Sequence, residues 1–516
     1  MLFAFLSYVP VLAQVDTGWV RRYDGLGSGL DLARALAVDN SGNVYVTGNS
    51  VGDVTSSDYA TIKYGPNGDT LWVRRYNGPG NDDDDAHAIA VDKDGNVYVT
   101  GYSRDSVNAF DFATIKYNLE GDTLWVRRYN GPGNINDYAL ALALDASGNA
   151  YVTGRSVGSG TSDDYVTIKY APNGDTLWVR RYNGPANGWD EPKALALDEI
   201  GNVYVTGSSV DSAVFYDYTT IKYALNGSTL WVRRYNGPGN YWDEPRSLAI
   251  DDSDNVYVTG FSYDTATSYD YATIKYSPSG DTLWVRRYDG PHGEAPEFSD
   301  DRAYALALDD SGNVYVTGGS TLHQGLYITP HYATVKYSPD GTIVWVKRYF
   351  GGLQATGLAV DDRKNIYITG TVYGGNSGSP DYGTIKYNSK GDTVWSRRYD
   401  GPRFDIDDAT SLAIDQAENI YITGYSLGIL TSFDYATIKY VTCLAKPGDA
   451  NSDDKYLLSD LVTIVNYLFK SQPLPSPLCR ADANGDGYVV LGDVTYLINF
   501  IFKAGSPPKK SSTCCL

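Results

Sequence analysis

Residues 71–117 read LWVRRYNGPGNDDDDAHAIAVDKDGNVYVTGYSRDSVNAFDFATIKY, and seven further copies of this pattern occur along the chain. Each copy opens near a tryptophan, and successive tryptophans are 53, 53, 53, 53, 53, 61 and 50 residues apart. The eight are Trp19, Trp72, Trp125, Trp178, Trp231, Trp284, Trp345 and Trp395. Self-similarity with a period near fifty residues is typical of stacked supersecondary units. The repeat therefore determines the fold class of most of the chain.

Each copy carries four short strand signals separated by turn-forming residues. In the copy that opens at Trp72 they are Leu71–Tyr76, Ala88–Val91, Val97–Thr100 and Phe112–Tyr117. Four antiparallel strands per repeat are the signature of a β-propeller. The alanine-rich strand is expected innermost, because only small side chains let the blades converge. The tryptophan strand is then outermost, with its arginines reaching water.

The segments Asn-Val-Tyr-Val-Thr-Gly and Asp-Tyr-Ala-Thr-Ile-Lys-Tyr make the chain resemble the bacterial β-propeller repeat (SBBP) family over roughly residues 17–440. The resemblance implies an extracellular propeller and no defined reaction. The array begins with an outer strand, Trp19–Tyr23, and ends with a third strand, Asp434–Tyr440. We therefore predict an all-β eight-bladed propeller over residues 14–442, closed when the first strand completes the last blade.

The composition limits the partners and the compartment. Lys and Arg total 42 against 62 Asp and Glu, so the net charge of −20 argues against nucleic acid and anionic membranes. Apolar residues 1–13 have the pattern of a signal peptide without its basic start, which predicts an extracellular protein. No other segment predicts a membrane span. Oxidation is then possible for Cys443, Cys479, Cys514 and Cys515, with the pairing open.

The copies differ mainly on one face, here called the top face, which carries the outer-to-inner and second-to-third loops. All length variation falls there, around the last three tryptophan copies, and marks either a binding face or a tolerant loop. Trp189 and Trp242 occupy matching top-face loops. With Asp190 and Asp243 they form the predicted ligand site, because aromatic rings beside carboxylates suit a sugar. Alternatively, each Trp packs under its own loop.

An aspartate recurs four residues before the alanine-rich strand. The series is Asp31, Asp84, Asp137, Asp190, Asp243, Asp301 and Asp407, and Leu353 interrupts it. Either these residues form a carboxylate ring at the top of the channel that attracts cations, or each caps a loop amide. The four histidines show no zinc spacing, and no nucleophile motif occurs, so we predict no catalytic residue.

Residues 443–507 follow another pattern, in which the spacing of a calcium loop occurs twice, each time before an apolar helix. The predicted ligands are Asp449, Asn451, Asp453 and Asp460, then Asp482, Asn484, Asp486 and Asp493. Oxygen ligands at this spacing match an EF-hand-type loop. The duplication resembles a type I dockerin domain, which implies two Ca²⁺ ions and a cohesin-like partner. Residues 508–516 are predicted to be a tail.

Two departures from the dockerin pattern affect its expected binding. Asp454 replaces the loop glycine of the first copy, whereas Gly487 keeps it in the second, so we expect the second ion to bind more tightly. The positions through which the family contacts its partner correspond to Leu458, Ser459, Leu491 and Gly492. Their apolar character leaves the identity of the partner open.

The sequence thus predicts a secreted, non-catalytic propeller that binds a glycan or a protein on its top face. A calcium-dependent dockerin would attach it to a cohesin-like partner in a polysaccharide-processing assembly. One alternative is a polysaccharide hydrolase or lyase of a cellulosome-like complex, and another is a structural surface or adhesion protein. The near-uniform repeats favour the first interpretation, because catalysis needs one blade unlike the others.

Overall fold

The computed structural model describes residues 15–27, 29–52, 56–107, 109–211, 215–291, 299–324, 327–373, 378–442, 448–451, 456–470, 472, 480–484, 488–503 and 505–508. The predicted signal peptide and all four cysteines lie outside these residues. The chain divides into two compact units, Val20–Ile438 and the combination of Met1–Trp19 with Lys439–Leu516, and each is described by itself.

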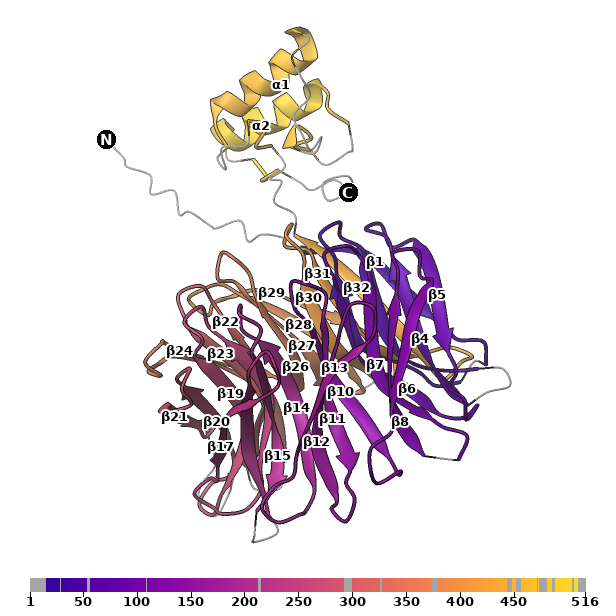
Figure 1. Cartoon of the computed structure of the whole chain (residues 1–516). Helices are drawn as coiled ribbons and strands as arrows, with labels where there is room; N and C mark the ends of the chain where they lie inside the picture. Colours follow the sequence, from indigo (N-terminus) through magenta and orange to yellow (C-terminus); the bar gives the residue numbers. More distant parts are fainter. Residues whose placement is uncertain are drawn as a thin grey trace. The chain divides into compact units, whose positions relative to one another are not determined.

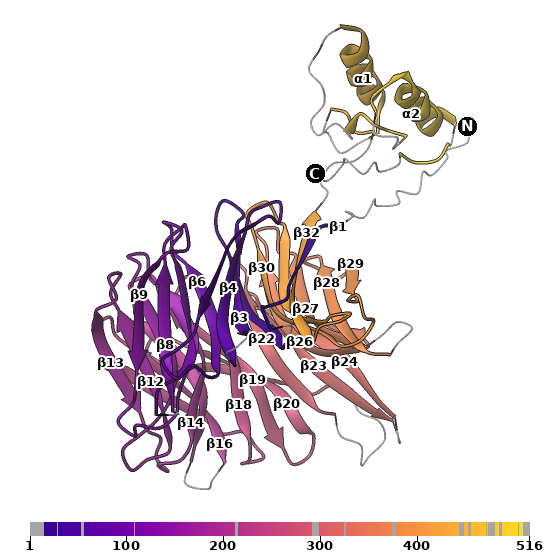
Figure 2. The same cartoon turned by 90° about the vertical axis from the view of Figure 1, so that its right-hand side faces the viewer.

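Eight four-stranded antiparallel sheets stand side by side around a common axis (Figures 1 and 2). Blades 1 to 7 are β2–β5, β6–β9, β10–β13, β14–β17, β18–β21, β22–β25 and β26–β29, and blade 8 is β30–β32 with β1. The first strands of successive blades contact one another, and β2 contacts β30, so the ring is continuous. The predicted eight-bladed propeller is confirmed.

Each blade uses its four strands in the same order from the axis outward. The innermost strands are β2 (Asp31–Val38), β6 (Asp84–Val91), β10 (Asp137–Leu144), β14 (Asp190–Leu197), β18 (Asp243–Ile250), β22 (Asp301–Leu308), β26 (Gly352–Val360) and β30 (Asp407–Ile414). The second strands are β3 (Val44–Val51), β7 (Val97–Arg104), β11 (Ala150–Val157), β15 (Val203–Val210), β19 (Val256–Asp264), β23 (Val314–Gln324), β27 (Ile366–Tyr373) and β31 (Ile420–Leu427).

The outer half of each blade completes the sheet. The third strands are β4 (Ser57–Tyr64), β8 (Phe110–Tyr117), β12 (Asp163–Tyr170), β16 (Tyr216–Tyr223), β20 (Ser268–Tyr276), β24 (Tyr327–Tyr337), β28 (Pro380–Tyr387) and β32 (Phe433–Thr442). The outermost strands are β5 (Thr70–Tyr76), β9 (Thr123–Tyr129), β13 (Thr176–Tyr182), β17 (Thr229–Tyr235), β21 (Thr282–Tyr288), β25 (Ile343–Phe350), β29 (Thr393–Tyr399) and β1 (Val15–Tyr23).

The first strand of the chain closes the ring, as its position in the repeat predicts. β1 pairs with β32 as the outer strand of blade 8. Arg22 Nη2 donates a hydrogen bond to Asp434 Oδ2 at 2.8 Å, and Tyr23 lies 5.5 Å from Tyr435 between ring centroids. Chain segments from the two ends of the repeat array therefore form one blade, so that β32 is paired on both sides and blade 8 has four strands like the others.

The inner strands begin earlier than expected and each contains a β-bulge. β2 begins at Asp31 rather than Ala35, and the register slips between Ala33 and Ala35, so that Arg34 has no partner opposite it. The same slip recurs in every inner strand. A bulge re-aims one side chain, and the residue at this position differs from blade to blade.

Neighbouring blades are held together by large side chains that the sheets bury between them. Tyr45, Tyr59 and Trp72 of blade 1 pack with Val99 and Ile115 of blade 2 in one hydrophobic cluster, and equivalent clusters recur around the ring. Trp72 is 8% exposed although it lies on the outermost strand. The tryptophan of the repeat therefore belongs to the core between blades.

The paired arginines of the outer strand do not simply reach water, which corrects the expectation from the sequence. Arg74 Nε donates to the carbonyl oxygen of Gly121 in the next blade at 2.6 Å. Arg75 is half-buried and donates to Asp58 Oδ2 at 2.9 Å. Gly121 has a φ of 84°, and a Cβ there would lie 2.9 Å from the Trp72 ring, which explains the glycine in this turn.

Two amphipathic helices lie near the C-terminus, as expected from the sequence. They are α1 (Leu458–Lys470) and α2 (Leu491–Lys503), and they pack against each other. Leu461 and Ile464 of α1 share a small core with Val494 and Leu497 of α2. No described helix has the length and apolar character needed to span a bilayer.

Candidate functional site

The recurring aspartates are buried loop caps and not an exposed ring. All seven are 1% exposed or less. Each accepts a hydrogen bond from a glycine amide in the preceding top-face loop at 2.5–2.7 Å, as Asp31 Oδ2 does from Gly25 at 2.7 Å. The loop-capping interpretation accounts for these residues. It also removes Asp190 and Asp243 from the surface on which a ligand could touch them.

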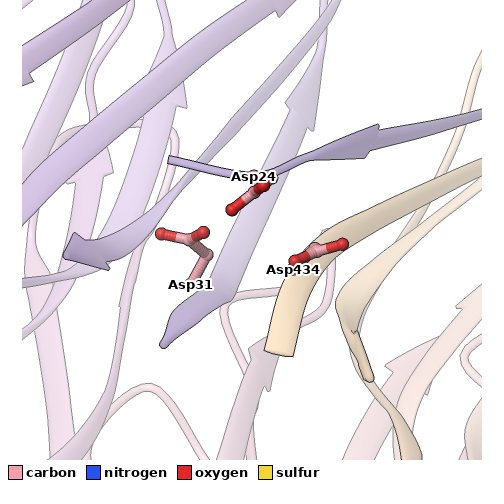
Figure 3. A group of neighbouring side chains, drawn as sticks. All are labelled: Asp24, Asp31 and Asp434. Carbon is pink, nitrogen blue, oxygen red and sulfur yellow. The ribbon is translucent and has the colours of Figure 1, made fainter. Parts of the chain in front are cut away.

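Further aspartates, some buried and some exposed, lie close to these caps where two blades meet. In Figure 3, Asp31 of blade 1 faces Asp24 and Asp434 of blade 8, and one oxygen from each lies within 4.8 Å of the others. Equivalent groups are Asp270, Asp289 and Asp301, and Asp381, Asp400 and Asp407. Arg22 bonds Asp434, so the protein itself supplies one compensating charge. Burial raises the pKa of Asp31, and Asp24 and Asp434 raise it further.

Burial makes several of these carboxyl groups unusually weak acids. Burial raises the pKa of Asp84, Asp137, Asp217 and Asp270 to about 6, and that of Asp381 to about 7. Neighbouring carboxylates add to the effect in each case. The five residues belong to five of the eight blade junctions, so a raised carboxyl pKa recurs around much of the ring.

The junction between blades 6 and 7 has lost this acidic arrangement. His331 stands where other blades have the third-strand aspartate, and Leu353 stands at the cap position. His331 packs on Phe350, with ring centroids 5.6 Å apart, and burial lowers the pKa of the imidazole. Phe350 is 73% exposed. The loops of unusual length lie around this junction. The change in loop length therefore occurs where the buried aspartates are replaced by His331 and Leu353.

The two predicted ligand-binding tryptophans are exposed at the top of blades 4 and 5. Trp189 is 40% and Trp242 is 44% exposed. Tyr216 lies between them, with its ring centroid 6.5 Å from that of Trp189 and 5.7 Å from that of Trp242. Tyr241 stacks on Trp242 at 6.0 Å with 16° between the planes. These four side chains, here called the Trp row, pack on one another through edge-to-face and stacked contacts, and Trp189, Tyr241 and Trp242 keep exposed surface.

Ion pairs at the top-face ends of β11, β14 and β18 border the Trp row. Lys193 and Arg246 are the bulge residues of β14 and β18. Lys193 Nζ lies 2.8 Å from Glu191 Oε2 and 3.3 Å from Glu244 Oε1, and Arg246 Nη2 lies 3.0 Å from Glu244 Oε1. Arg155 places its guanidinium 4.9 Å from the Trp189 ring centroid. The carboxylates near the tryptophans are therefore Glu191 and Glu244.

The sequence alone did not identify most of the residues around the Trp row. Glu191 and Glu244 directly follow the predicted ligands Asp190 and Asp243 in the sequence. The structure distinguishes them because the two aspartates are fully buried and the two glutamates are partly exposed. Tyr216 could have been found, because it replaces the small Ser57 of blade 1 at the start of the third strand. Its closeness to Trp242 of the next blade depends on the packing between blades and has no signal in the sequence.

A second polar group joins blades 1 and 2 at the same end of the inner strands. His87 Nε2 lies 3.7 Å from Asp85 Oδ2, and burial lowers the pKa of the imidazole. Asp85 Oδ2 also accepts hydrogen bonds from Arg34 Nη2 at 3.2 Å and from Tyr102 Oη at 3.3 Å. These donors hold the carboxylate in place, so we assign the group a structural role in the contact between blades 1 and 2. The expectation that no residue is catalytic stays a prediction.

The two C-terminal loops repeat one hydrogen-bond pattern. Asp460 accepts hydrogen bonds from the amides of Asn451 and Leu457 at 3.2 and 2.8 Å. Asp493 accepts from the two equivalent amides of the second loop at 3.1 and 2.9 Å. The last predicted ligand of each loop is therefore fixed to its own loop at the start of a helix. The two loops therefore have the same local geometry.

The described loop residues fit a hard cation with oxygen ligands. Asp449, Asp460, Asp482 and Asp493 have no exposed surface, although an uncompensated buried carboxylate is costly. Arg480 Nη1 compensates one of them by donating to Asp449 Oδ2 at 2.8 Å. The remaining predicted ligands Asp453 and Asp486 lie outside the described residues. The carboxylates and Asn451 and Asn484 are the residues that would hold Ca²⁺.

Comparisons with known proteins agree with the repeat and the fold. The beta-propeller repeat (SBBP) family model matches residues 71–105 and 394–431. An uncharacterized WD repeat-containing protein of Acanthamoeba polyphaga mimivirus is 24% identical over 427 residues, which cover 66% of this chain and 29% of that protein. The chain thus spans less than a third of the length of this relative.

Two solved structures are similar to the chain at low sequence identity. The WD40 domain of SCAP from fission yeast is 10% identical, with a TM-score of 0.45 over 83% of this chain and 98% of that chain. An α-L-arabinofuranosidase of Fusarium graminearum is 11% identical, with a TM-score of 0.36 over 58% of this chain and 91% of that chain. The eight four-stranded sheets form a β-propeller built from sequence repeats, and two stretches of the chain match the beta-propeller repeat model.

Proposed function

We propose that this protein is a non-catalytic extracellular propeller that binds a glycan or a protein through its top face. A calcium-dependent, dockerin-like C-terminal module would attach it to a cohesin-like partner in a polysaccharide-processing assembly. The observation that carries the proposal is the Trp row, which exposes two tryptophans in blades 4 and 5. Partly exposed aromatic rings with polar groups beside them are suited to recognition, because they combine apolar area with hydrogen bonding.

Replacing both Trp189 and Trp242 by Ala should reduce binding of the top-face ligand at least tenfold and leave the propeller folded. Tryptophan is a frequent hot-spot residue, and these two side chains contribute little to the buried core. A glycan array and pull-down of candidate proteins identify the ligand, and calorimetry on the wild type and the double variant measures the loss. Retained affinity in the double variant would place the site elsewhere.

Two control measurements separate the proposal from its alternatives. The variant Trp72→Ala removes one of the buried tryptophans that recur in each repeat, so it should lower the stability of the propeller. An assay for released reducing sugars on the ligand tests for hydrolysis. Product formation that stops in a top-face variant would favour a hydrolase or lyase, and the absence of any ligand would favour a structural surface protein.

The attachment role is supported by apolar side chains on the two C-terminal helices. Leu458 is 60% and Leu491 is 58% exposed, and Ser459 and Gly492 beside them are also exposed. Leu458 and Leu491 begin α1 and α2, directly beside the calcium-type loops. Exposed leucines at equivalent places of a duplicated module are suited to a protein partner, because their burial contributes to binding.

Calcium should stabilise the C-terminal module and leave the propeller transition unchanged. Ions neutralise the buried carboxylates, and binding to the folded state alone raises its stability. Scanning calorimetry of the full chain with and without a chelator measures this. Asp449→Ala and Asp482→Ala should each remove one site, with the greater loss of affinity for Asp482→Ala because the second loop retains its glycine. The exposed turn variant Asp122→Ala is the control, and a thermogram independent of calcium would contradict the proposal.

A further inference from the structure

The Trp row continues at one end into aromatic side chains of blades 2 and 3. Tyr102, Phe110 and Tyr138 form a cluster, here called the blade 2 cluster, with ring centroids 4.8–5.5 Å apart. Arg155 lies 4.2 Å from the Tyr138 ring centroid and 4.9 Å from that of Trp189. The guanidinium therefore links this cluster to the Trp row through two cation–π contacts.

The Trp row continues at its other end along blade 5. Tyr241 lies 5.1 Å from Tyr263, and Tyr263 lies 5.4 Å from Tyr269. Arg302 of blade 6 places its guanidinium 4.5 Å from the Tyr269 ring centroid. Tyr263 and Tyr269 are called the blade 5 cluster. Together with the Trp row and the blade 2 cluster they form an aromatic arc over four consecutive blades.

The register of the strands places the whole arc on the top face. Phe110, Tyr216 and Tyr269 occupy the first or second residue of a third strand, and Tyr102 and Tyr263 lie near the end of a second strand. Both places are at the top in every blade. Blade 1 has Asn49 and Ser57 at the positions of Tyr102 and Phe110, with Asn49 Nδ2 donating to Ser57 Oγ at 2.8 Å. The arc is therefore a feature of particular blades and is not required by the repeat.

The charges beside the arc balance one another. Arg155 Nη1 lies 3.2 Å from Asp163 Oδ2, and Arg155 Nε lies 3.7 Å from Glu191 Oε1. With Lys193, Arg246 and Glu244 this makes three cations and three carboxylates in contact. A balanced network produces little net field at the surface, so it gives no preference to a charged ligand.

We propose that the aromatic arc is an extended binding track for a linear, uncharged polysaccharide. The proposal rests on the proposed function, because the Trp row is the centre of the track. The exposed rings of Trp189, Tyr241 and Trp242 can stack on the C–H faces of sugar rings, and the half-buried rings of the two end clusters extend the apolar contact. The paired Arg, Lys, Glu and Asp groups offer donors and acceptors to the hydroxyls. A protein partner would need a dry apolar centre, and ion pairs interrupt the aromatic surface here.

The test compares ligands of increasing length on the full chain. The probes are neutral β-linked gluco-, manno- and xylo-oligosaccharides from disaccharide to decasaccharide, with polygalacturonate as an acidic polymer. For at least one neutral series, affinity should keep rising with chain length beyond the fragment that fills the Trp row. Polygalacturonate should bind more weakly than the neutral chain, since a charged polymer gains nothing from a balanced surface.

Variants at the ends of the arc decide whether the track is extended. Tyr102→Asn with Phe110→Ser installs the residue pair that blade 1 already uses, so the blade should fold. It should weaken binding of the decasaccharide about tenfold and leave a disaccharide unaffected. Tyr269→Ser should act likewise. The matched control is Tyr425→Asn with Phe433→Ser, which removes an equivalent ring pair, 5.2 Å apart, from blade 8 outside the arc.

The possible failures are distinguishable. If the Trp variants abolish glycan binding but the end variants do not change the affinity for long chains, the track is refuted and the proposed function stands. If no glycan binds and a protein ligand is lost in the Trp variants, the polysaccharide track is refuted. The proposed function, which allows a protein ligand, then stands. A ligand whose affinity does not change when Trp189 and Trp242 are replaced refutes both the track and the proposed function.

Discussion

A chain that lacks residues 14–24 should unfold at a much lower temperature than the intact protein and should aggregate. The deletion removes β1, the outer strand of blade 8, and leaves the backbone groups of β32 unpaired. It also removes Val15 and Trp19, which are 1% and 7% exposed, and each such side chain contributes about 2 kcal/mol through burial.

The deletion has an electrostatic cost as well. Arg22 donates to Asp434 and to Ser426, and Asp434 is only 5% exposed. Breaking a buried ion pair by removing one partner costs about 3–5 kcal/mol, because the other charge stays buried. Arg22→Ala alone should therefore reproduce a large part of the loss while retaining the strand.

Thermal unfolding followed by tryptophan fluorescence measures these effects, and light scattering reports aggregation. The control is a chain that lacks only residues 1–13 and therefore begins at residue 14. It should unfold at the same temperature as the intact protein. If the chain without residues 14–24 unfolds at the normal temperature, β1 does not close the ring in solution.

The propeller should be more stable at pH 5 than at pH 7.5. The pKa values of Asp84, Asp137, Asp217 and Asp270 are about 6 and that of Asp381 about 7, all above the ordinary value of 3.8. A raised pKa means that the folded state binds a proton where the unfolded state does not. The resulting stabilisation is complete below the unfolded pKa and is lost as the pH rises through about 6 to 7.

The size of the effect follows from the number of junctions. Each unit of pKa shift corresponds to about 1.4 kcal/mol, so each of the five junctions contributes on the order of 2 kcal/mol over this range. His87 and His331 oppose the trend, because burial lowers their pKa and protonation below pH 6.5 favours the unfolded state. Five raised carboxyl groups outweigh two histidines, so the net slope should be negative.

Chemical denaturation at a series of pH values, with a chelator present, measures the slope. Asp137→Asn tests its origin, because an amide can still accept the hydrogen bond from Gly131 but carries no charge near Asp111. This variant should be more stable than the wild type at pH 7.5 and should show a smaller slope. Asp122→Asn, at an exposed turn, should change neither, and stability that rises from pH 5 to 7.5 would contradict the prediction.

Much of the architecture could be predicted because its signals are local and recur in phase. The tryptophan spacing determined the number of blades, and alternation within each copy determined its four strands. The array starts at Trp19 in an outer strand and ends at Tyr440 in a third strand, which predicted the closure through β1. The spacing of apolar residues after the two aspartate-rich loops likewise predicted α1 and α2.

The site was predicted only in part, because its chemistry depends on contacts between residues of different blades. The sequence identified Trp189 and Trp242 by their matching loops, but Asp190 stands beside Trp189 in the chain and turns inward to cap Gly184. Glu191, the next residue, faces Lys193 instead. Neighbours in a strand point to opposite sides, and only the β-bulge and the packing of the next blade decide which side meets a ligand.

The sequence by itself thus determined the repeat, the ring and its closure, since each follows from local pattern and phase. The tertiary structure decided that Arg75 is paired with Asp58, that Asp137 keeps a raised pKa, and that Tyr216 lies beside Trp242. The Arg75–Asp58 pair depends on the pairing of β5 with β4 within blade 1. The other two properties depend on burial and on distances across blade junctions, where residues far apart in the chain come together. The sequence of one copy does not record them, because each depends on groups that the fold brings together from different strands.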